Sequence, residues 1–316
     1  MSGLRKIVLL VVLALFMGSG CTEFIEPSLA KAEMRLLAPA EATESNSYQQ
    51  TFWWQQQQDA LWYRLQIVTP SFTRVEKLLL DTLVSADKFT YTLDPGSYQW
   101  RVRAENGSSQ TPFSTQSFTI YPASLKEQIV QVVAPANTLF TASAELKYSW
   151  LNLFGASGYR LQVDQNNFVD ENKLVLNEVT DNLTFTQTLS LEGKYQFRVR
   201  AENATENSKW SAVREFSYDA TPPLQVTLTS PANKQTVATP LTLRWDELAD
   251  ATKYELVVYK SDSTTLFSSI YPQLVSGNSA TFNAGSAGET IVWRVRAIDR
   301  VGNKGVFSGF FSFIVQ

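Results

Sequence analysis

Large apolar residues alternate with polar ones in three short stretches of the chain that have nearly the same sequence. The first begins Tyr98-Gln-Trp-Arg-Val, and it returns in residues 195–203 and 291–299, so the copies start 97 and 96 residues apart. A period of two over seven residues, rich in aromatic residues and valine, predicts a β-strand with one face in a core and one in water. A helix would scatter Tyr98, Trp100 and Val102 over different sides, so a helical interpretation fails.

Further landmarks recur in the same order and define a repeated unit of about 96 residues. Each unit has an apolar run that predicts its first strand, in residues 34–37, 129–133 and 224–228, and then a proline that ends or bends that strand. Short strands separated by turns over this length predict a β-sandwich, because solenoid repeats have only about 20–50 residues. The prolines are Pro39, Pro135 and Pro231; each unit continues with a tryptophan, Trp54, Trp150 or Trp245, and nine residues later a tyrosine, Tyr63, Tyr159 or Tyr254.

Most tryptophans have a place in these predicted cores. Trp210 aligns with Phe113 and Phe307 just before the last strand of each unit, which indicates a structural role. Trp53 and Trp62 are left over, because alternation turns both of them outward. The tryptophans that alternation turns inward are Trp54, Trp100, Trp150, Trp245 and Trp293.

The landmarks together resemble fibronectin type III modules, and the resemblance covers nearly all of the chain after residue 33. It rests on the tryptophan and tyrosine positions, on Leu93-Asp-Pro-Gly-Ser-Tyr98 and on the Tyr-x-Trp-x-Val-x-Ala strand. The resemblance implies an all-β fold of three tandem fibronectin type III-like, or immunoglobulin-like, β-sandwiches, each with a sheet of three strands and a sheet of four. It also implies a tyrosine corner at Tyr98 and Tyr195, where the hydroxyl bonds a nearby backbone group. The third copy has Ile291 there, so packing must hold its corner.

We therefore expect three modules in residues 34–122, 123–220 and 221–316. The segment 219–223, Asp-Ala-Thr-Pro-Pro, resembles a short stiff linker of bacterial modules of this kind, since two prolines restrict the hinge. The first junction, residues 121–128, has one proline and a possible helical turn, which favours a looser connection.

Residues 1–21 have the pattern of a secretory signal peptide with a lipoprotein-like end. Arg5 and Lys6 precede an apolar run of eleven residues, 7–17, which is too short for a spanning helix of about 20 residues. The Gly-Ser-Gly sequence before Cys21 resembles the lipobox of bacterial lipoproteins, although a glycine stands where the motif usually has an aliphatic residue. The resemblance implies cleavage before Cys21, diacylation of its thiol and attachment to a membrane. The alternative is an ordinary signal peptide that leaves a free thiol.

Residues 22–33 have little periodicity and suit a tether between the lipid and the first module. Residue 22 is a threonine, whereas an aspartate at this position resembles an inner-membrane retention signal. We therefore expect the outer membrane of a bacterial, Bacteroidetes-like cell envelope, facing either side.

Charge and composition exclude several classes of function. The net charge of −3 becomes −5 without Arg5 and Lys6, and the chain has no basic run, so nothing favours nucleic-acid binding. It has no histidine and one cysteine, which removes histidine-based catalytic triads, histidine metal sites and internal disulfides. No pair of carboxylates can be placed in an inward cleft for glycoside hydrolysis. We expect no enzyme, no cofactor and no metal.

The candidate binding residues lie in the first module. Trp62, Arg64, Arg101 and Arg103 are predicted on the outer face of its larger sheet, and Trp53 is predicted on the opposite sheet, so the two tryptophans cannot form one platform. Exposed tryptophans are enriched at recognition surfaces. The alternative is that each covers a domain junction or an arginine stem.

The arginines have two interpretations as well. Equivalent arginines occur in all three copies, at 101 and 103, 198 and 200, and 294 and 296. One interpretation is an anion-binding stripe. The other, which repetition in all copies favours, is that the arginine stems cover apolar surface and stack on aromatic rings, with Trp62 as the ring in the first module.

Three weaker patterns remain. Gln55–Gln58 fills the turn before the third predicted strand, and a glycan-binding role there is unspecific. The oxygen-rich segment 164–170 lacks the glycine and the terminal glutamate of an EF-hand loop. Asp81-Thr82-Leu83 and Asp262-Ser263-Thr264 resemble acceptor tripeptides for O-glycosylation in Bacteroidetes-type bacteria, a short pattern that also arises by chance.

Two functions from different classes follow. The first is a cell-envelope lipoprotein that binds a protein or polysaccharide partner through its modules. The second is a structural spacer, or an accessory subunit that docks on a larger outer-membrane complex. Only the first module carries spare tryptophans and a glutamine run, which favours binding by that module.

Overall fold

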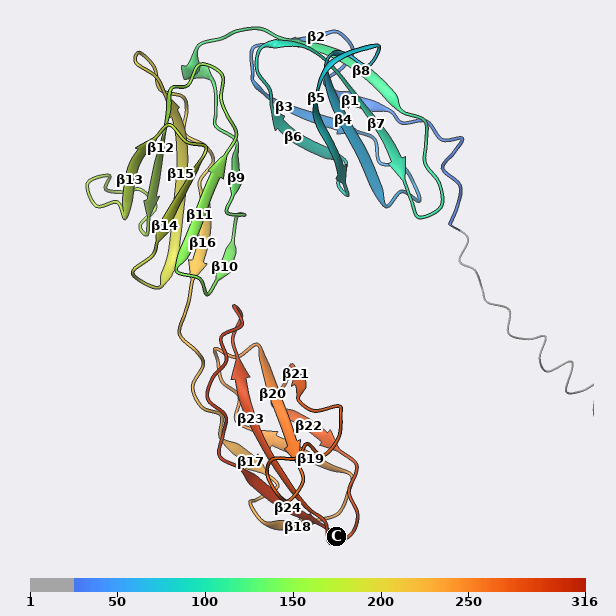
Figure 1. Cartoon of the computed structure of the whole chain (residues 1–316), viewed down its shortest axis with the longest axis vertical. Coiled ribbons are helices and arrows are strands. Elements are labelled where there is room, and N and C mark those ends of the chain that lie inside the picture. The colour runs from blue at the N-terminus through green and yellow to red at the C-terminus, as the bar shows by residue number, and fades with distance from the viewer. Residues whose placement is uncertain (1–25) are drawn as a thin grey trace, which may run out of the picture. The chain divides into compact units, whose positions relative to one another are not determined.

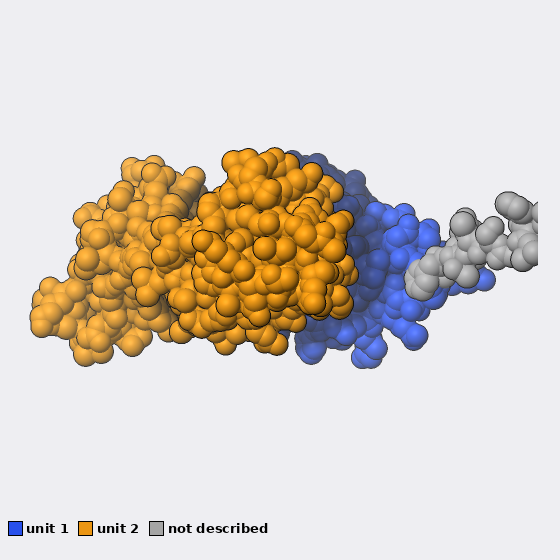
Figure 2. All heavy atoms as spheres, turned by 90° about the horizontal axis from the view of Figure 1, so that it is seen from below, with its two compact units in different colours: residues 1–128 blue, residues 129–316 orange. Residues whose placement is uncertain are grey.

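The computed structural model describes residues 26–316, so the predicted signal peptide and Cys21 lie outside the described residues. The chain folds into three β-sandwiches in sequence order (Figure 1). It divides between Gln128 and Ile129 into two compact units, of which the second holds two of the three sandwiches (Figure 2). Residues 26–316 contain one helical turn, Leu125–Glu127, and no helix long and apolar enough to cross a membrane. The predicted all-β sandwich fold is confirmed.

The strands follow one plan in all three modules. The first module has β1 (Leu36–Ala38), β2 (Thr43–Ser45), β3 (Gln49–Trp54), β4 (Trp62–Ser71), β5 (Arg74–Val84), β6 (Lys88–Thr92), β7 (Gly96–Glu105) and β8 (Ser114–Ile120). The second has β9 (Val132–Ala134), β10 (Leu139–Thr141), β11 (Glu145–Trp150), β12 (Gly158–Asp164), β13 (Leu176–Thr180), β14 (Thr184–Thr188), β15 (Gly193–Glu202) and β16 (Arg214–Tyr218). The third has β17 (Leu228–Ser230), β18 (Gln235–Val237), β19 (Leu241–Trp245), β20 (Lys253–Tyr259), β21 (Gln273–Val275), β22 (Ser279–Phe282), β23 (Thr290–Ile298) and β24 (Phe311–Val315).

Each sandwich pairs a three-stranded sheet with a five-stranded sheet, and the expectation of four strands in the larger sheet is wrong. In the first module the orders are β1-β3-β6 and β2-β8-β7-β4-β5. The extra strand, β2, follows Pro39 and pairs in parallel with β8. Because proline cannot donate a backbone hydrogen bond, pairing in the first sheet stops there and the chain continues at the edge of the other sheet. The same crossing follows Pro135 and Pro231, so that β10 pairs with β16 and β18 with β24. The first strands also lie slightly later in the sequence than the apolar runs predicted.

The cores consist of the inward residues that alternation predicted. Trp54, Trp100 and Trp293 have no exposed surface, and Trp150 and Trp245 have 2% or less. Each tryptophan on the second core strand packs against the tyrosine nine residues later, with ring centroids 5.5–5.7 Å apart. Burying one large aromatic side chain contributes roughly 1.5–3 kcal/mol, so these pairs are major contributors to each fold.

The corners also follow the prediction in two copies. The hydroxyl of Tyr98 donates to the backbone carbonyl of Asp94 at 2.6 Å, and that of Tyr195 donates to the carbonyl of Leu191. Burial raises the pKa of Tyr98 to about 12, so the phenol keeps its proton and the bond at ordinary pH. In the third copy Ile291 is fully buried, so packing holds this position.

Candidate functional site

The candidate site begins on the outer face of the five-stranded sheet in the first module, where β4 and β7 lie side by side. Backbone pairing sets Arg64 opposite Arg103 and Gln66 opposite Arg101. The outer face predicted for the three arginines is thus the one they occupy. Antiparallel pairing keeps such opposite residues on the same face of a sheet. The four polar side chains are thus neighbours across the centre of this sheet.

Aromatic rings cover the two arginines of β7. The guanidinium carbon of Arg101 lies 4.0 Å from the ring centre of Phe72 and 4.2 Å from that of Phe113. The guanidinium of Arg103 lies 4.7 Å from the ring centre of Phe113. A planar guanidinium over a ring face gains electrostatic attraction and shields both groups from water. The stacking rings are those of Phe72 and Phe113, so the prediction that Trp62 is the stacking ring is wrong. Phe113 comes from the segment just before β8, which lies over this face of the sheet.

The same arrangement recurs in the other modules. Trp210 stacks on Arg198 and Arg200 at 4.3 and 4.7 Å, and Phe307 stacks on Arg294 and Arg296 at 4.1 and 4.3 Å. The predicted structural role of Trp210 is therefore confirmed. Its alignment with Phe113 and Phe307 was the signal in the sequence that could have identified the stacking partner.

Carboxylates neutralise Arg64 and Arg103. Glu105 accepts from Arg103 at 2.8 Å and from Arg64 at 3.1 Å, and Arg64 also pairs with Asp81 at 2.9 Å. Arg101 donates to the side-chain oxygen of Gln66. Since each of these arginines already bonds a carboxylate or a side-chain amide oxygen, this face fits a structural ladder better than an anion-binding stripe.

The second module has equivalent ion pairs, and they lower the pKa of Glu202. Glu202 accepts from Arg160 and Arg200, both at 2.7 Å. Burial by itself raises the pKa of Glu202, but the hydrogen bonds from the two arginines outweigh it and hold the pKa below its usual value. The stabilisation is therefore fully present above the usual value of 4.5 and is lost as pH falls through the lower, folded-state pKa.

We expect Glu202→Gln to lower the free energy of unfolding of the second module by about 1 kcal/mol at pH 7, between the values for exposed and buried ion pairs. The difference from the parent should shrink as the pH falls below 4.5, because the carboxylate of the unfolded chain then takes up a proton more readily than the ion-paired carboxylate of the folded chain. Thermal unfolding at pH 7, 5 and 3 measures this. Glu178→Gln, at an exposed acid of the same module, is the control. An equal difference at pH 7 and pH 3 would contradict the ion-pair explanation.

Trp62 is exposed at the start of β4, at the end of the same face. It is 49% exposed, and two large apolar neighbours, Leu61 and Leu83, are 52% and 47% exposed. Leu83 lies on β5 opposite Arg64, next to Trp62 along the sheet. We call Leu61, Trp62, Arg64 and Leu83 the Trp62 surface. It consists of three exposed apolar side chains and the ion-paired Arg64.

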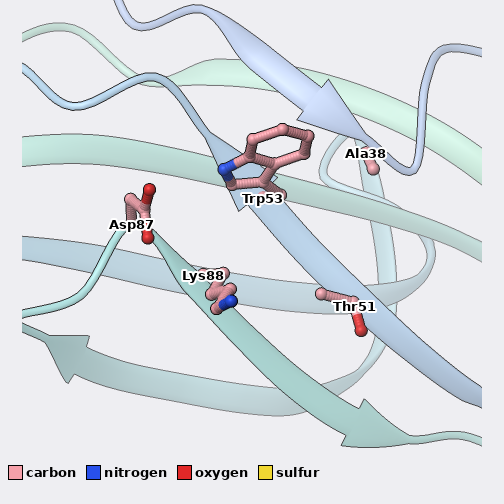
Figure 3. A pocket seen from close by; sticks show the side chains of 5 residues that line it. All are labelled: Ala38, Thr51, Trp53, Asp87 and Lys88. Carbon is pink, nitrogen blue, oxygen red and sulfur yellow. The ribbon is translucent and has the colours of Figure 1, made fainter.

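Trp53 lies on the other sheet, as predicted, and is 46% exposed. It is on β3, the central strand of the three-stranded sheet, between Ala38 on β1 and Lys88 on β6. A hollow of about 450 Å³ lies beside it, lined also by Thr51 and Asp87 (Figure 3). The sequence did not indicate this hollow, because its residues come from strands that are distant in the chain.

The weaker patterns have structural roles in the described residues. Gln55–Gln58 forms the connection between β3 and β4, as expected. Asp164 is buried and accepts from the backbone of Phe168 at 2.6 Å. Asp262 accepts from the backbone of Thr264 and from the backbone and hydroxyl of Thr265. Residues 26–316 contain no group of three or more His, Cys, Asp or Glu side chains placed to hold a metal ion.

These sheets and cores define a protein of three tandem β-sandwiches, each with a three-stranded and a five-stranded sheet. No protein-family model and no curated protein matches the sequence. Among solved structures, the FN1–FN3 domains of chicken CNTN1 are 15% identical, with a TM-score of 0.41 over 90% of this chain and 97% of that chain. The fibronectin(III)-like modules of Clostridium thermocellum CbhA are 13% identical, with a TM-score of 0.36 over 59% of this chain and 94% of that chain. The assignment of the fold class rests on the sheets themselves.

Proposed function

We propose that this chain is a non-enzymatic binding protein of a bacterial cell envelope, held to the outer membrane by a lipid on Cys21. Its first module would bind a protein or polysaccharide partner through the Trp62 surface. The observation that carries the proposal is a 49%-exposed tryptophan which the fold does not need. The absence of histidine and the presence of one cysteine support a role other than catalysis.

The comparison between copies supports a role for Trp62 outside folding. Backbone pairing sets Trp62 opposite Glu105, and the same place is held by Gly158 in the second module and Lys253 in the third. The fold therefore accepts a tryptophan, a glycine or a lysine at this strand position. A large apolar ring left in water by one copy is typical of a contact residue, because tryptophan is enriched among residues that dominate binding energy.

The borders of this surface favour a stable contact. The ion pairs of Arg64 with Asp81 and Glu105 hold its guanidinium in place beside the indole. Arg101 and Arg103 are held further along the sheet by Phe72 and Phe113. A partner that packs on Trp62 would thus meet side chains that are already ordered, which reduces the entropy lost on binding.

We expect Trp62→Ala to weaken partner binding at least about 30-fold, the equivalent of roughly 2 kcal/mol for a dominant contact residue. The measurement is a quantitative pull-down from solubilised envelope with the mature chain, followed by titration of the captured partner. Val179→Ala is the matched control, because Val179 is an equally exposed apolar residue on the same face of the second module. A Trp62→Ala chain that melts at a lower temperature yet captures its partner at full strength would reject the assignment and leave a spacer role.

A further inference from the structure

The hollow beside Trp53 has the dimensions and the setting of a small-ligand site. Its volume of about 450 Å³ lies within the range of about 300–1,000 Å³ that is usual for ligand pockets. The floor is the outer face of the three-stranded sheet, where β3 runs between β1 and β6. Figure 3 shows the indole of Trp53 on this face, with the small side chain of Ala38 on one side and Asp87 and Lys88 on the other. Trp53 is 46% exposed, so part of its indole ring is accessible from this hollow.

Two charged groups at this hollow have no partner in the fold. Within residues 26–316, neither the carboxylate of Asp87 nor the ammonium of Lys88 makes a hydrogen bond or an ion pair, although the backbone carbonyl of Asp87 accepts from Trp54. This contrasts with the arginine ladder on the opposite sheet, where Arg64 and Arg103 share Glu105. The Asp87 carboxylate, which accepts hydrogen bonds, and the Lys88 ammonium, which can donate three, are thus available to a ligand beside the exposed Trp53 ring.

The other modules show that the fold does not require these residues. In the second module the positions of Trp53, Asp87 and Lys88 are occupied, in that order, by Ser149, Leu183 and Thr184. In the third module they hold Arg244, Asn278 and Ser279. The combination of an exposed indole with a free acceptor and a free donor therefore occurs in the first module alone among the three.

We propose that this hollow binds one pyranose ring of a neutral polysaccharide. A pyranose has an apolar face of C–H groups that stacks on an indole, and its rim carries hydroxyl groups that both donate and accept. Asp87 would accept from one hydroxyl and Lys88 would donate to another, while Trp53 carries the apolar face. The opposite charges of Asp87 and Lys88 cancel, which favours an uncharged ligand. A peptide anchor fits less well, because the hollow is open to solvent and would leave much of a large apolar side chain in water.

This site is independent of the Trp62 surface. Trp53 is on β3 in the three-stranded sheet, whereas Trp62 is on β4 in the five-stranded sheet. Sugar binding at Trp53 therefore stands if the Trp62 assignment fails, and the two assignments can be tested with the same protein.

The test is native affinity electrophoresis of the mature chain in gels that contain mannan, mixed-linkage β-glucan, xyloglucan or dextran. We expect at least one of these polymers to slow migration. Trp53→Ser should abolish the retardation, because it removes the stacking ring and installs the residue that the second module carries at this position. Asp87→Asn introduces the residue that the third module has at this position. It should raise the dissociation constant, calculated from the retardation, by about 10-fold or more. This variant still tests the site if Trp53→Ser disturbs the sheet.

Trp62→Ala is run beside these variants, and the control is Val179→Ala, at an exposed apolar position of the second module, which should migrate like the parent in every gel. Loss of retardation in the Trp53 and Asp87 variants alone supports the site. Equal migration of the parent with and without all four polymers overturns it, and so does retardation that survives both variants. Retardation that is lost only with Trp62→Ala would place sugar binding on the other sheet and would also overturn this proposal.

Discussion

Trp150→Ala is expected to lower the free energy of unfolding of the second module by about 3–5 kcal/mol, the usual range for removing a core aromatic ring. Trp150 is 2% exposed and packs against Tyr159, with ring centroids 5.7 Å apart. The surrounding sheets close only partly over the missing ring, so the loss includes a cavity as well as buried surface. This is a large fraction of the stability of one domain.

The loss should be confined to the second module. The core of the third module is a cluster of its own, from Val226 to Val315, that contains no residue of the second. Calorimetry of the mature chain should therefore show one early transition and leave the other two in place. Val213→Ala, an exposed position in the same module, is the control and should change little. One shifted transition for the whole chain would show that the modules unfold as a single cooperative unit.

Cys21→Ser is expected to move the protein from the membrane fraction to the soluble periplasmic or extracellular fraction. Stable attachment requires two membrane-binding signals, which a diacylated thiol provides and a serine hydroxyl does not. Fractionation with immunoblotting measures the change, and loss of labelling by a radioactive fatty acid shows whether the lipid was on Cys21.

Thr22→Ser, which keeps the cysteine and alters its neighbour, is the control and should stay with the membrane. If Cys21→Ser also stays in the membrane fraction at the parent level, the anchor is elsewhere. That result would favour the ordinary signal peptide and a free thiol, and it would leave the sandwich fold and the Trp53 site unaffected.

The candidate site could be foreseen only in part. Alternation placed Trp53 and Trp62 outside, and it put Arg64 and Arg103 on one outer face, because the side-chain period of a strand follows from local geometry. Which side chains these residues contact depends on the register between strands and on the path of the loops. The stacking of Phe113 on Arg101, and the meeting of Trp53 with Asp87 and Lys88, join segments that only the folded sheets bring together.

Local sequence determined the strands, the inward tryptophans and the corners at Tyr98 and Tyr195, since each depends on side chains a few residues apart. The 96-residue spacing also determined the number of modules. Only the tertiary structure decided that the larger sheet has five strands. The short segment after Pro39 has a weak strand signal of its own, and it becomes β2 because the open edge of β8 supplies its hydrogen bonds.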